Sequence, residues 1–390
     1  MKKTITPKRK VCFVITSFIH YSRSILILEE LRTRKDVELY IIVGGTAILS
    51  KYSASSAYVR KILEQDGYKN IYELHFNLEG DDAIVKTKTI GLGVIEFASI
   101  YNHIKPDMVV IRGDRFEIFA AAIAAANMNI PIAHIEGGDV SGTIDESLRH
   151  AITKLSHIHF TTNDEAKERV IRMGENKDYV FNFGSPEVEV VSKMPLKADR
   201  VNLEETGSGA KLDPSKEFLM VMYHPVTTEL DKIGENVRTL LNAVHKTKMP
   251  TIWFWPNFDA GAEQISHELR VFKEHVKDHR IRFMRYLPPK DFIWLLRRTS
   301  CLVGNSSAGI KETSFLGVPV IDVGTRQNGR LSSSNVVKVG YNEAKIVEAI
   351  KNQVKNGRYP VSDIYKGEDT AKKIAEKIAT AKLYVQKKFE

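Results

Sequence analysis

Short apolar runs rich in β-branched residues alternate with amphipathic stretches along most of the chain. In the first half, six such runs end in glycine or polar residues, as buried strands do: residues 11–18, 37–45, 108–114, 130–138, 158–163 and 179–185. Helical stretches at 22–34, 116–128 and 145–156 separate several of them. Near-continuous apolar strands between helices predict a parallel sheet that is covered on both faces.

A second alternating series begins after a polar interruption. Residues 186–216 are rich in charge, Gly and Pro, and we interpret them as the interdomain connection. Six further strands are then predicted, at 218–225, 251–257, 281–288, 301–307, 318–324 and 336–340. The tail, 368–389, predicts one amphipathic helix. A chain of 390 residues exceeds the size at which a single core keeps growing. We therefore predict an α/β protein with domains at 1–186 and 187–370, followed by a C-terminal helix at 371–390.

The composition is that of an ordinary soluble globular protein, with 43% hydrophobic and 27% charged residues. No apolar run approaches the ~20 residues needed to cross a bilayer, so we expect no membrane partner. The start is basic, but the apolar stretch after it is short and lacks a cleavage site, which favours a first strand over a signal peptide. Cys12 and Cys301 lie in apolar runs and are expected to be reduced core residues of a cytoplasmic protein.

The net charge of +9 arises largely near the two termini. No basic stripe is interleaved with aromatic residues, so we expect no nucleic-acid partner. A mild positive field suits an anionic small molecule such as a nucleotide diphosphate. The sequence has no Cys/His spacing typical of zinc and no GxxxxGK[ST] or GxGxxG loop. We therefore predict no metal, no nicotinamide and no other cofactor.

Acidic residues follow two neighbouring predicted strands of the first half. One run ends in Gly-Asp at Asp114, the next ends in Glu-Gly-Gly at Glu136, and Asp145 and Glu146 follow. Ligands of open α/β sheets bind outside the carboxyl ends of the strands, where acids can transfer protons. The alternative is that these acids are helix N-caps and solvated loop residues. Two adjacent strands that end in acid plus glycine favour a site.

Residues 304–317, GNSSAGIKETSFLG, predict an anion site in the second half. Gly304 permits close backbone approach, Ser306 and Ser307 supply hydroxyls and amide donors, and a helix N-terminus favours an anion. Glu312, about one turn into the predicted helix, could accept both hydroxyls of a ribose. The alternatives are a plain serine N-cap and a capping-box or surface glutamate.

Three more polar residues follow predicted strands of the second half. Arg326 could hold a diphosphate, because a guanidinium matches phosphate geometry, or it could be a surface arginine. His224 and Asn257 each come directly after a strand. A lone histidine is more often a packed or capping residue than a catalytic one, but a position on the same cleft as the acids favours a functional role.

Several of these segments together resemble one protein family. GDRFE, HIEGGDVSGTIDESLRHAITKLSHIHF, HPVTTE, GNSSAGIKE and GTRQNGR resemble the UDP-hydrolysing branch of the UDP-N-acetylglucosamine 2-epimerase family, in the same order over nearly the whole chain. TIDESLRHAITKLSH is similar to the branch used in sialic-acid and related nonulosonate synthesis. The resemblance implies two Rossmann-like, doubly wound domains that face each other across a cleft, as in the GT-B fold. It also implies a C-terminal helix that packs back on the first domain, and a homodimer or homotetramer.

The resemblance further implies a UDP-sugar substrate and roles for the residues. Elimination of UDP would give a 2-acetamidoglucal, and hydration would then give N-acetylmannosamine, or the same reaction would run on a diacetamido-deoxy UDP-sugar. Asp114 and Glu136 would be the acid and base, supported by Asp145 and Glu146, with His224 at the diphosphate or leaving group. The residues implied to bind the UDP-sugar are Arg23, Arg115, Asn257, Ser306, Ser307, Glu312 and Arg326.

The first loops depart from the family pattern. Phe18 stands where the family usually has an arginine, His20 where it has an aspartate, and Ala47 where it has a histidine. We hypothesise that His20 acts in place of the missing acid. Three alternatives stay open: a non-hydrolysing UDP-N-acetylglucosamine 2-epimerase, a GT-B glycosyltransferase, and a nucleotide-sugar-binding protein.

Overall fold

The strands form where the apolar runs predict them, because β-branched side chains pack well on a pleated and doubly covered sheet. The structure is a computed structural model that describes residues 7–49, 58–80, 82–194, 203, 207–276, 278–285 and 287–388. The predicted interdomain connection, 186–216, is described only in part, since residues 195–202 and 204–206 lie outside the described residues. Two short strands, at 71–73 and 208–209, are not among the predicted ones.

The chain divides into two compact units. Unit 1 comprises residues 1–139, 145–190 and 367–390, and unit 2 comprises 140–144 and 191–366. After the short excursion at 140–144, the chain passes to unit 2 inside helix α7 (Pro186–Lys193), and the last passage returns the C-terminal segment to unit 1. The C-terminal helix therefore packs with the first unit, as the family resemblance implies.

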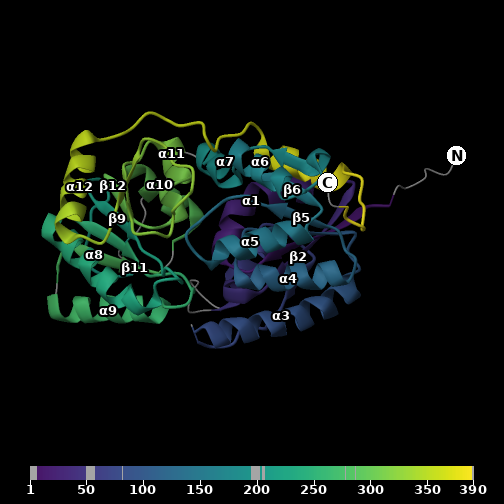
Figure 1. Cartoon of the computed structure of the whole chain (residues 1–390), viewed down its shortest axis with the longest axis horizontal. Coiled ribbons are helices and arrows are strands. Elements are labelled where there is room, and N and C mark those ends of the chain that lie inside the picture. Colours follow the sequence, from purple (N-terminus) through teal and green to yellow (C-terminus); the bar gives the residue numbers. More distant parts are fainter. Residues whose placement is uncertain are drawn as a thin grey trace. The chain divides into compact units, whose positions relative to one another are not determined.

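The sheet of unit 1 is parallel throughout, in the order β3-β2-β1-β4-β5-β6-β7. Figure 1 labels its strands β2, β5 and β6. Its strands are β1 (Arg9–Ile15), β2 (Val37–Val43), β3 (Ile71–Glu73), β4 (Met108–Arg112), β5 (Ile132–Ile135), β6 (Ile158–Thr161) and β7 (Val180–Asn182). The order reverses direction between β1 and β4, which is the topological switch point of a doubly wound fold.

Helices cover both faces of this sheet. Alternate residues of β1 enter two separate cores: Val11, Phe13 and Ile15 pack with α1 and α13, whereas Cys12 and Val14 pack with α3 and α4. The helices of unit 1 are α1 (Phe18–Thr33), η1 (Gly45–Ile48), α2 (Tyr58–Gln65), α3 (Ala83–Ile104), α4 (Phe116–Asn127), α5 (Ile144–Leu155), α6 (Asp164–Arg172), η3 (Lys177–Tyr179), α7 and α13 (Thr370–Thr380).

Unit 2 repeats the arrangement, in the order β14-β13-β12-β9-β10-β11-β8. Its strands are β8 (Ser208–Gly209), β9 (Leu219–Met222), β10 (Thr251–Phe254), β11 (Ile281–Met284), β12 (Cys301–Gly304), β13 (Val320–Val323) and β14 (Val336–Val339), and β8 alone among these is antiparallel to its neighbour. Its helices are η4 (Leu230–Lys232), α8 (Ile233–Thr247), α9 (Ala262–Val276), α10 (Pro289–Arg298), η5 (Ser307–Gly309), α11 (Glu312–Leu316) and α12 (Glu343–Asn356). Two Rossmann-like, doubly wound units confirm the predicted fold class.

Contacts within unit 1 hold the segment around α7 against the C-terminal segment that begins at residue 367. Gly367 lies so close to the carbonyl of Phe183 that an added Cβ would be 1.8 Å from that oxygen. Thr370 donates its hydroxyl to the same carbonyl at 2.5 Å. The carboxylate of Glu189, on α7, accepts from the amide of Ala371 at 2.6 Å and so satisfies one donor at the start of α13.

The prediction of one helix over 368–389 is wrong beyond Thr380. Helix α13 ends there because the following backbone carbonyls have side-chain partners elsewhere in unit 1. Tyr179 donates to the carbonyl of Lys382 at 3.1 Å, and His157 contacts the carbonyl of Val385 at 3.0 Å. The segment 381–388 is therefore an irregular strap on unit 1.

A buried glutamate anchors the end of this strap. Glu175 is 2% exposed, and its carboxylate contacts Lys154 at 2.7 Å, Lys387 at 2.6 Å and His159 at 3.1 Å. Lys387 also donates to the backbone carbonyls of Lys154 and Ser156, at 2.6 and 2.5 Å. The ammonium group of Lys387 thus ties the strap to α5 and to the carboxylate that follows α6.

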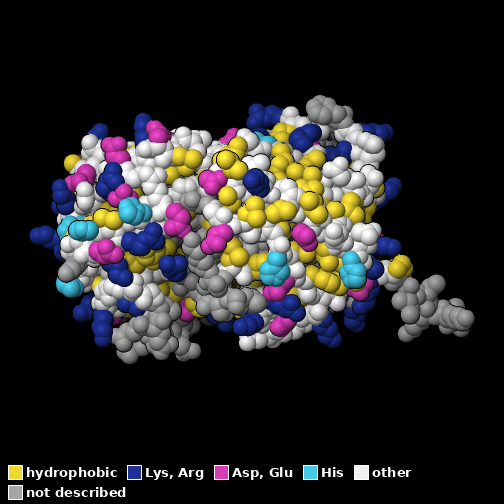
Figure 2. Space-filling view, turned by 90° about the horizontal axis from the view of Figure 1, so that it is seen from below, with side chains coloured by type: hydrophobic (Ala, Val, Ile, Leu, Met, Phe, Trp, Pro, Cys, Tyr) yellow, Lys and Arg dark blue, Asp and Glu magenta, His cyan; other side chains and the backbone are white. Residues whose placement is uncertain are grey.

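One side of α3 is apolar and exposed. Ile84, Leu92 and Ile95 are 67%, 40% and 62% exposed. Figure 2 views the molecule from the side on which α3 lies, and hydrophobic side chains gather over much of that part of the surface. Among the described residues, no helix is both long enough and apolar enough to span a bilayer.

Replacing Lys387 by methionine removes one of the cations that hold the strap. We expect the free energy of unfolding at pH 7 to fall by about 1 to 2 kcal/mol, because a buried carboxylate loses a partner that is itself partly exposed. Urea unfolding measures the change. Lys388→Met is the matched control, since Lys388 is exposed and should change stability by less than about 0.5 kcal/mol.

The difference in the free energy of unfolding between Lys387→Met and wild type should depend on pH. Burial alone would raise the pKa of Glu175, but hydrogen bonds from His159, Lys154 and Lys387 outweigh it and lower the pKa from 4.5 to about 2. The stabilisation is therefore complete above the ordinary pKa and is lost as the pH falls towards 2. The difference between Lys387→Met and wild type should shrink between pH 5 and pH 3; a growing difference would contradict the assignment.

Candidate functional site

The switch point of each sheet gathers polar residues. In unit 1 the loops after β1 and β4 meet there, and in unit 2 the loops after β9 and β12 do so. Ligands of doubly wound sheets bind outside the carboxyl ends of the strands at this place. The two groups of residues are described separately below.

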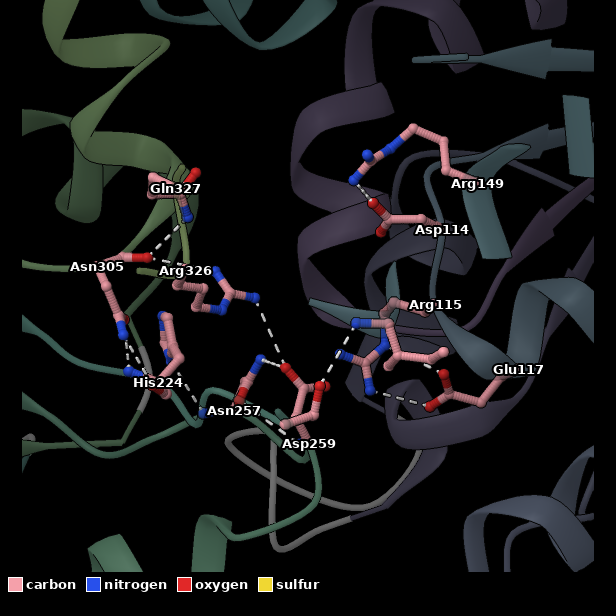
Figure 3. A network of polar contacts seen from close by, with 12 residues as sticks. Asp114, Arg115, Glu117, Arg149, His224, Asn257, Asp259, Asn305, Arg326 and Gln327 are labelled. Atoms are coloured by element: carbon pink, nitrogen blue, oxygen red, sulfur yellow. Dashed lines mark hydrogen bonds and ion pairs between the residues drawn. The ribbon is translucent and has the colours of Figure 1, made fainter. Parts of the chain in front are cut away.

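Asp114 follows β4 and is held by a buried arginine. Arg149, on α5, is 2% exposed and forms an ion pair with the Asp114 carboxylate (Figure 3). The same guanidinium donates to the backbone carbonyl of Asp139 at 2.8 Å. Arg149 therefore fixes both the acid after β4 and the loop after β5, while the Asp114 side chain keeps 23% of its surface exposed.

Glu136 follows β5 in a strained backbone conformation. Its φ is +73°, in the left-handed region that residues with a Cβ rarely adopt. Its carboxylate accepts from Nε of Arg112 at 3.0 Å, and its side chain is 12% exposed. Strain of this kind persists where the surrounding structure enforces it, and it concentrates at active sites.

Neutral histidines support the loop between β4 and α4. His134, fully buried on β5, donates Nε2–H to the carbonyl of Gly113 at 2.9 Å, and burial lowers its pKa to about 4. A Cβ added to Gly113 would lie 3.5 Å from Nε2 of His20 and 4.0 Å from Oε2 of Glu136. Burial, together with the charges of Arg115 and Arg112, lowers the pKa of His20 to about 3. His20 is therefore a neutral ring beside the Glu136 carboxylate.

The other residues expected in unit 1 lie near these acids with different partners. Arg115 precedes α4 and donates twice to the buried carboxylate of Glu117, each time at 3.1 Å (Figure 3). Asp145 and Glu146 lie in the first turn of α5, and Glu146 is 3.7 Å from Nε2 of His150. Arg23, on α1, offers its backbone carbonyl to Arg112 at 2.6 Å.

Asn305 links the two loops at the switch point of unit 2. Its Oδ1 accepts from the amide of His224 at 2.7 Å, and its Nδ2 donates to the carbonyl of His224 at 2.9 Å (Figure 3). Gly304 precedes it at φ +131°, where an added Cβ would be 2.1 Å from the carbonyl of Met222. This close approach of β12 to β9 requires glycine.

His224 has a defined orientation and, when neutral, a defined proton. It is 8% exposed, and its Nδ1 accepts from the amide of Asn257 at 3.2 Å. The proton of the neutral ring is therefore on Nε2. Asn257 also donates to Asp259, which lies 3.6 Å from Arg326 (Figure 3). The structure thus brings His224, Asn257 and Arg326 together, as the sequence predicts.

The loop after β13 completes the group. Arg326 and Gln327 both donate to the carbonyl of Asn305, at 3.3 and 2.8 Å. Beneath them on β13, Asp322 is 2% exposed, and burial raises its pKa to about 6. Asp322 pairs in register with Gly304, so this buried carboxyl lies on the strand next to the one that leads into the serines.

The prediction of one helix that begins at the serines and includes Glu312 is wrong. Ser306 caps a three-residue 3₁₀ helix, η5, by accepting from the amide of Ala308 at 3.4 Å, and Ser307 begins that helix. Glu312 is instead the first residue of the separate helix α11 and is 4% exposed. The break arises where the chain turns at residues 310–311, which keeps Glu312 buried.

Sequence reasoning does not find the residues that hold these groups in place. Arg112, Arg149 and Asn305 are all buried. A charged residue at the end of an apolar strand, as in MVVIR, is the one available signal for Arg112. Its carboxylate partners lie 24 and 75 residues away in the sequence, so spacing cannot reveal them.

Comparison with known proteins agrees with this architecture. A family model described as UDP-N-acetylglucosamine 2-epimerase matches residues 29–379. The chain is 31% identical over 378 residues to the UDP-N,N'-diacetylbacillosamine 2-epimerase (hydrolyzing) of Legionella pneumophila, covering 97% of each chain. It is 33% identical over 346 residues to a UDP-N-acetylglucosamine 2-epimerase of Neisseria meningitidis, covering 88% of this chain and 87% of that protein.

A solved structure shares the fold. The UDP-GlcNAc 2-epimerase of Methanocaldococcus jannaschii, crystallised with UDP-GlcNAc and UDP, has a TM-score of 0.77 at 16% identity and covers 95% of this chain and 99% of that chain. Two Rossmann-like units with polar groups at their switch points define a GT-B-like α/β protein. The chain belongs to the UDP-N-acetylglucosamine 2-epimerase family, in its hydrolysing branch.

The strain at Glu136 predicts an unusual order of stabilities. Glu136→Ala and Glu136→Gly both remove the carboxylate, but glycine adopts φ +73° without a Cβ penalty. We expect Glu136→Gly to be more stable than Glu136→Ala by about 1 kcal/mol in urea unfolding. At Glu146, inside α5, the order should reverse, with alanine more stable than glycine by up to about 1 kcal/mol. Equal stability of the two Glu136 variants would exclude backbone strain.

Proposed function

We propose that the protein is a hydrolysing 2-epimerase that acts on UDP-N-acetylglucosamine or on a diacetamido-deoxy UDP-sugar. The similarity to the Legionella pneumophila enzyme, over 97% of both chains, supports the hydrolysing activity. Two free, buried thiols, Cys12 and Cys301, support a cytoplasmic location.

One observation carries the proposal: two carboxylates follow neighbouring strands, and a different buried arginine holds each of them. Asp114 is paired with Arg149, and Glu136 with Arg112. β4 and β5 are paired such that Arg112 lies opposite Ile135, so the two acids leave the sheet side by side. A reaction that inverts a carbon needs two proton-transfer groups that approach from different sides, which matches two independently fixed acids.

The proposed reaction has two steps. First, a carboxylate takes the C2 proton, the C2–H electron pair becomes the C1–C2 double bond, and the C1–O bond breaks to release UDP. Water then adds its hydroxyl to C1 of the 2-acetamidoglucal, and C2 receives a proton from the opposite face. The sum is UDP-sugar plus water giving UDP plus the 2-epimeric free sugar. Asp114 and Glu136 serve as the two proton-transfer groups, with Asp145 and Glu146 supporting them. His20, which replaces the usual aspartate, is proposed as a neutral hydrogen-bonding partner.

Unit 2 is proposed to bind the UDP moiety. Charge builds on the diphosphate as the C1–O bond breaks, and fixed donors stabilise it best. Arg326 and the Nε2–H of His224 are donors of this kind, and Ser306 and Ser307 add hydroxyls. Glu312 is proposed to accept from the ribose hydroxyls and Asn257 to contact the nucleotide. Arg23 and Arg115 of unit 1 are proposed as further contacts to the substrate.

A non-hydrolysing 2-epimerase is the second candidate. The relative from Neisseria meningitidis, at 33% identity, carries the name UDP-N-acetylglucosamine 2-epimerase without mention of hydrolysis. In that reaction UDP would add back to the glycal, and the product would remain a UDP-sugar.

Proton NMR of the protein with UDP-N-acetylglucosamine in deuterium oxide separates these candidates. We expect free N-acetylmannosamine that is deuterated at C2, with one UDP released for each sugar. A deuterated UDP-sugar without free UDP would move the protein to the non-hydrolysing reaction. Inertness towards this sugar and towards UDP-N,N'-diacetylbacillosamine would leave a glycosyltransferase or a nucleotide-sugar-binding protein. Asp114→Asn should lower turnover at least about 100-fold while UDP affinity changes little, because UDP is bound by unit 2.

We further propose that the protein is a homodimer or homotetramer whose interface includes the apolar side of α3. Ile95, 62% exposed, lies on that side of the helix. Ile95→Lys should lower the mass measured by light scattering to that of a smaller species. Val361→Lys is the control, since Val361 is 59% exposed in unit 2. An unchanged mass for Ile95→Lys would exclude this side of α3 from the interface.

A further inference from the structure

Arg112 contacts two carboxylates inside unit 1. It is the last residue of β4 and is fully buried. Its Nε donates to Glu136 at 3.0 Å, while a terminal nitrogen forms an ion pair with Glu187. The other terminal nitrogen donates to the carbonyl of Arg23 at 2.6 Å. The guanidinium therefore has no freedom to turn towards one acid at the expense of the other.

Glu187 has no place in the proposed chemistry, yet it is almost completely buried. Its side chain is 1% exposed in the first turn of α7. A buried carboxylate is costly unless a cation compensates it, and Arg112 is that cation. The negative charge of Glu187 repels that of Glu136 and so offsets part of the attraction that Arg112 exerts on Glu136.

We propose that Arg112 and Glu187 are positioning residues that together set the orientation and proton affinity of Glu136. This inference rests on the proposed function, in which Glu136 transfers a proton. Arg112 holds the Glu136 carboxylate in place against its strained backbone and favours its charged form. Glu187, through its own negative charge, offsets part of that effect, so that Glu136 can both accept and return a proton.

The other titratable and charged groups near Glu136 are left unmutated in the test. His20 of α1 is neutral because burial, with Arg115 and Arg112, lowers its pKa to about 3. Asp114 and Arg115 follow β4, and Arg149 of α5 is paired with Asp114. Arg112 pairs with both Glu187 and Glu136, so a change at Glu187 can reach Glu136 through this guanidinium.

The test is a double-mutant cycle of Arg112→Gln and Glu187→Gln, read from the pH dependence of kcat. Arg112→Gln should move the limb of the profile that Glu136 controls to higher pH, because the Glu136 carboxylate loses its cation. Glu187→Gln should move the same limb to lower pH, because the negative charge of Glu187 is removed and Arg112 is paired with Glu136 alone. Each single change should lower kcat at neutral pH by about 10- to 100-fold with KM changed less than about threefold. The double variant should return the limb towards its wild-type position.

Glu189→Gln is the matched control. Glu189 is a second buried glutamate on α7, 4% exposed, and it accepts from the amide of Ala371. Its loss should lower the melting temperature without moving the limb. If both single variants at Arg112 and Glu187 merely lower stability, or move the limb in the same direction, the two residues are structural and the inference is overturned.

A second readout separates this inference from the proposed function. In protein labelled with ¹³C at glutamate carboxyl carbons, the Glu136 signal is identified by its loss in Glu136→Gln, and its titration is followed in each variant. Opposite displacements of that titration would support the positioning role even if no UDP-sugar is turned over. Identical titrations in all variants would overturn it, whatever the enzyme's activity. UDP affinity and melting temperature verify that every variant is folded.

Discussion

Burial of both faces of each parallel sheet is the constraint on which the placement of the functional groups depends. Strands covered on both sides must be largely apolar, as in β1, where the residues from Val11 to Ile15 are all fully buried. Polar groups within the strands, such as His134 and Asp322, are buried, so those that can meet a ligand lie where the strands end. Since parallel strands end at one edge, side chains far apart in sequence meet there, and the switch point supplies the space between them.

Ion pairs between two buried arginines and the acids fix the side chains at this edge of unit 1. Arg112 and Arg149 are nearly inaccessible to solvent, and burying such a cation is favourable only when carboxylates and carbonyls satisfy it. Each guanidinium therefore ties an acid to a neighbouring backbone segment: Arg149 joins Asp114 to the carbonyl of Asp139, and Arg112 joins Glu136 to that of Arg23. The acids are held before any substrate binds, which lowers the cost of orienting them.

The sequence predicts the parts of the fold that depend on local pattern. Twelve apolar runs correspond to strands of the two sheets, whereas β3 (Ile71–Glu73) and β8 (Ser208–Gly209) are too short to show a period. The acids after β4 and β5 are visible because Gly-Asp and Glu-Gly-Gly interrupt apolar runs. The groups that hold them are not, because their partners lie far away in the sequence. The prediction of where α13 ends is wrong for the same reason. Contacts with Tyr179 and His157, rather than helix propensity, decide that end.

The two units use different physical means at equivalent positions, and this difference bears on the choice among the candidate functions. Unit 2 links its loops mainly through neutral hydrogen bonds centred on Asn305, which leave its arginine near the edge of the sheet. In unit 1, by contrast, two buried arginines hold two acids in place at the strand ends. A protein that only binds a nucleotide sugar gains nothing from strain at Glu136, and a glycosyltransferase needs no second fixed acid on the neighbouring strand. Removal and return of a proton at one carbon calls for two proton-transfer groups, so the two fixed acids of unit 1 match epimerisation under the proposed function.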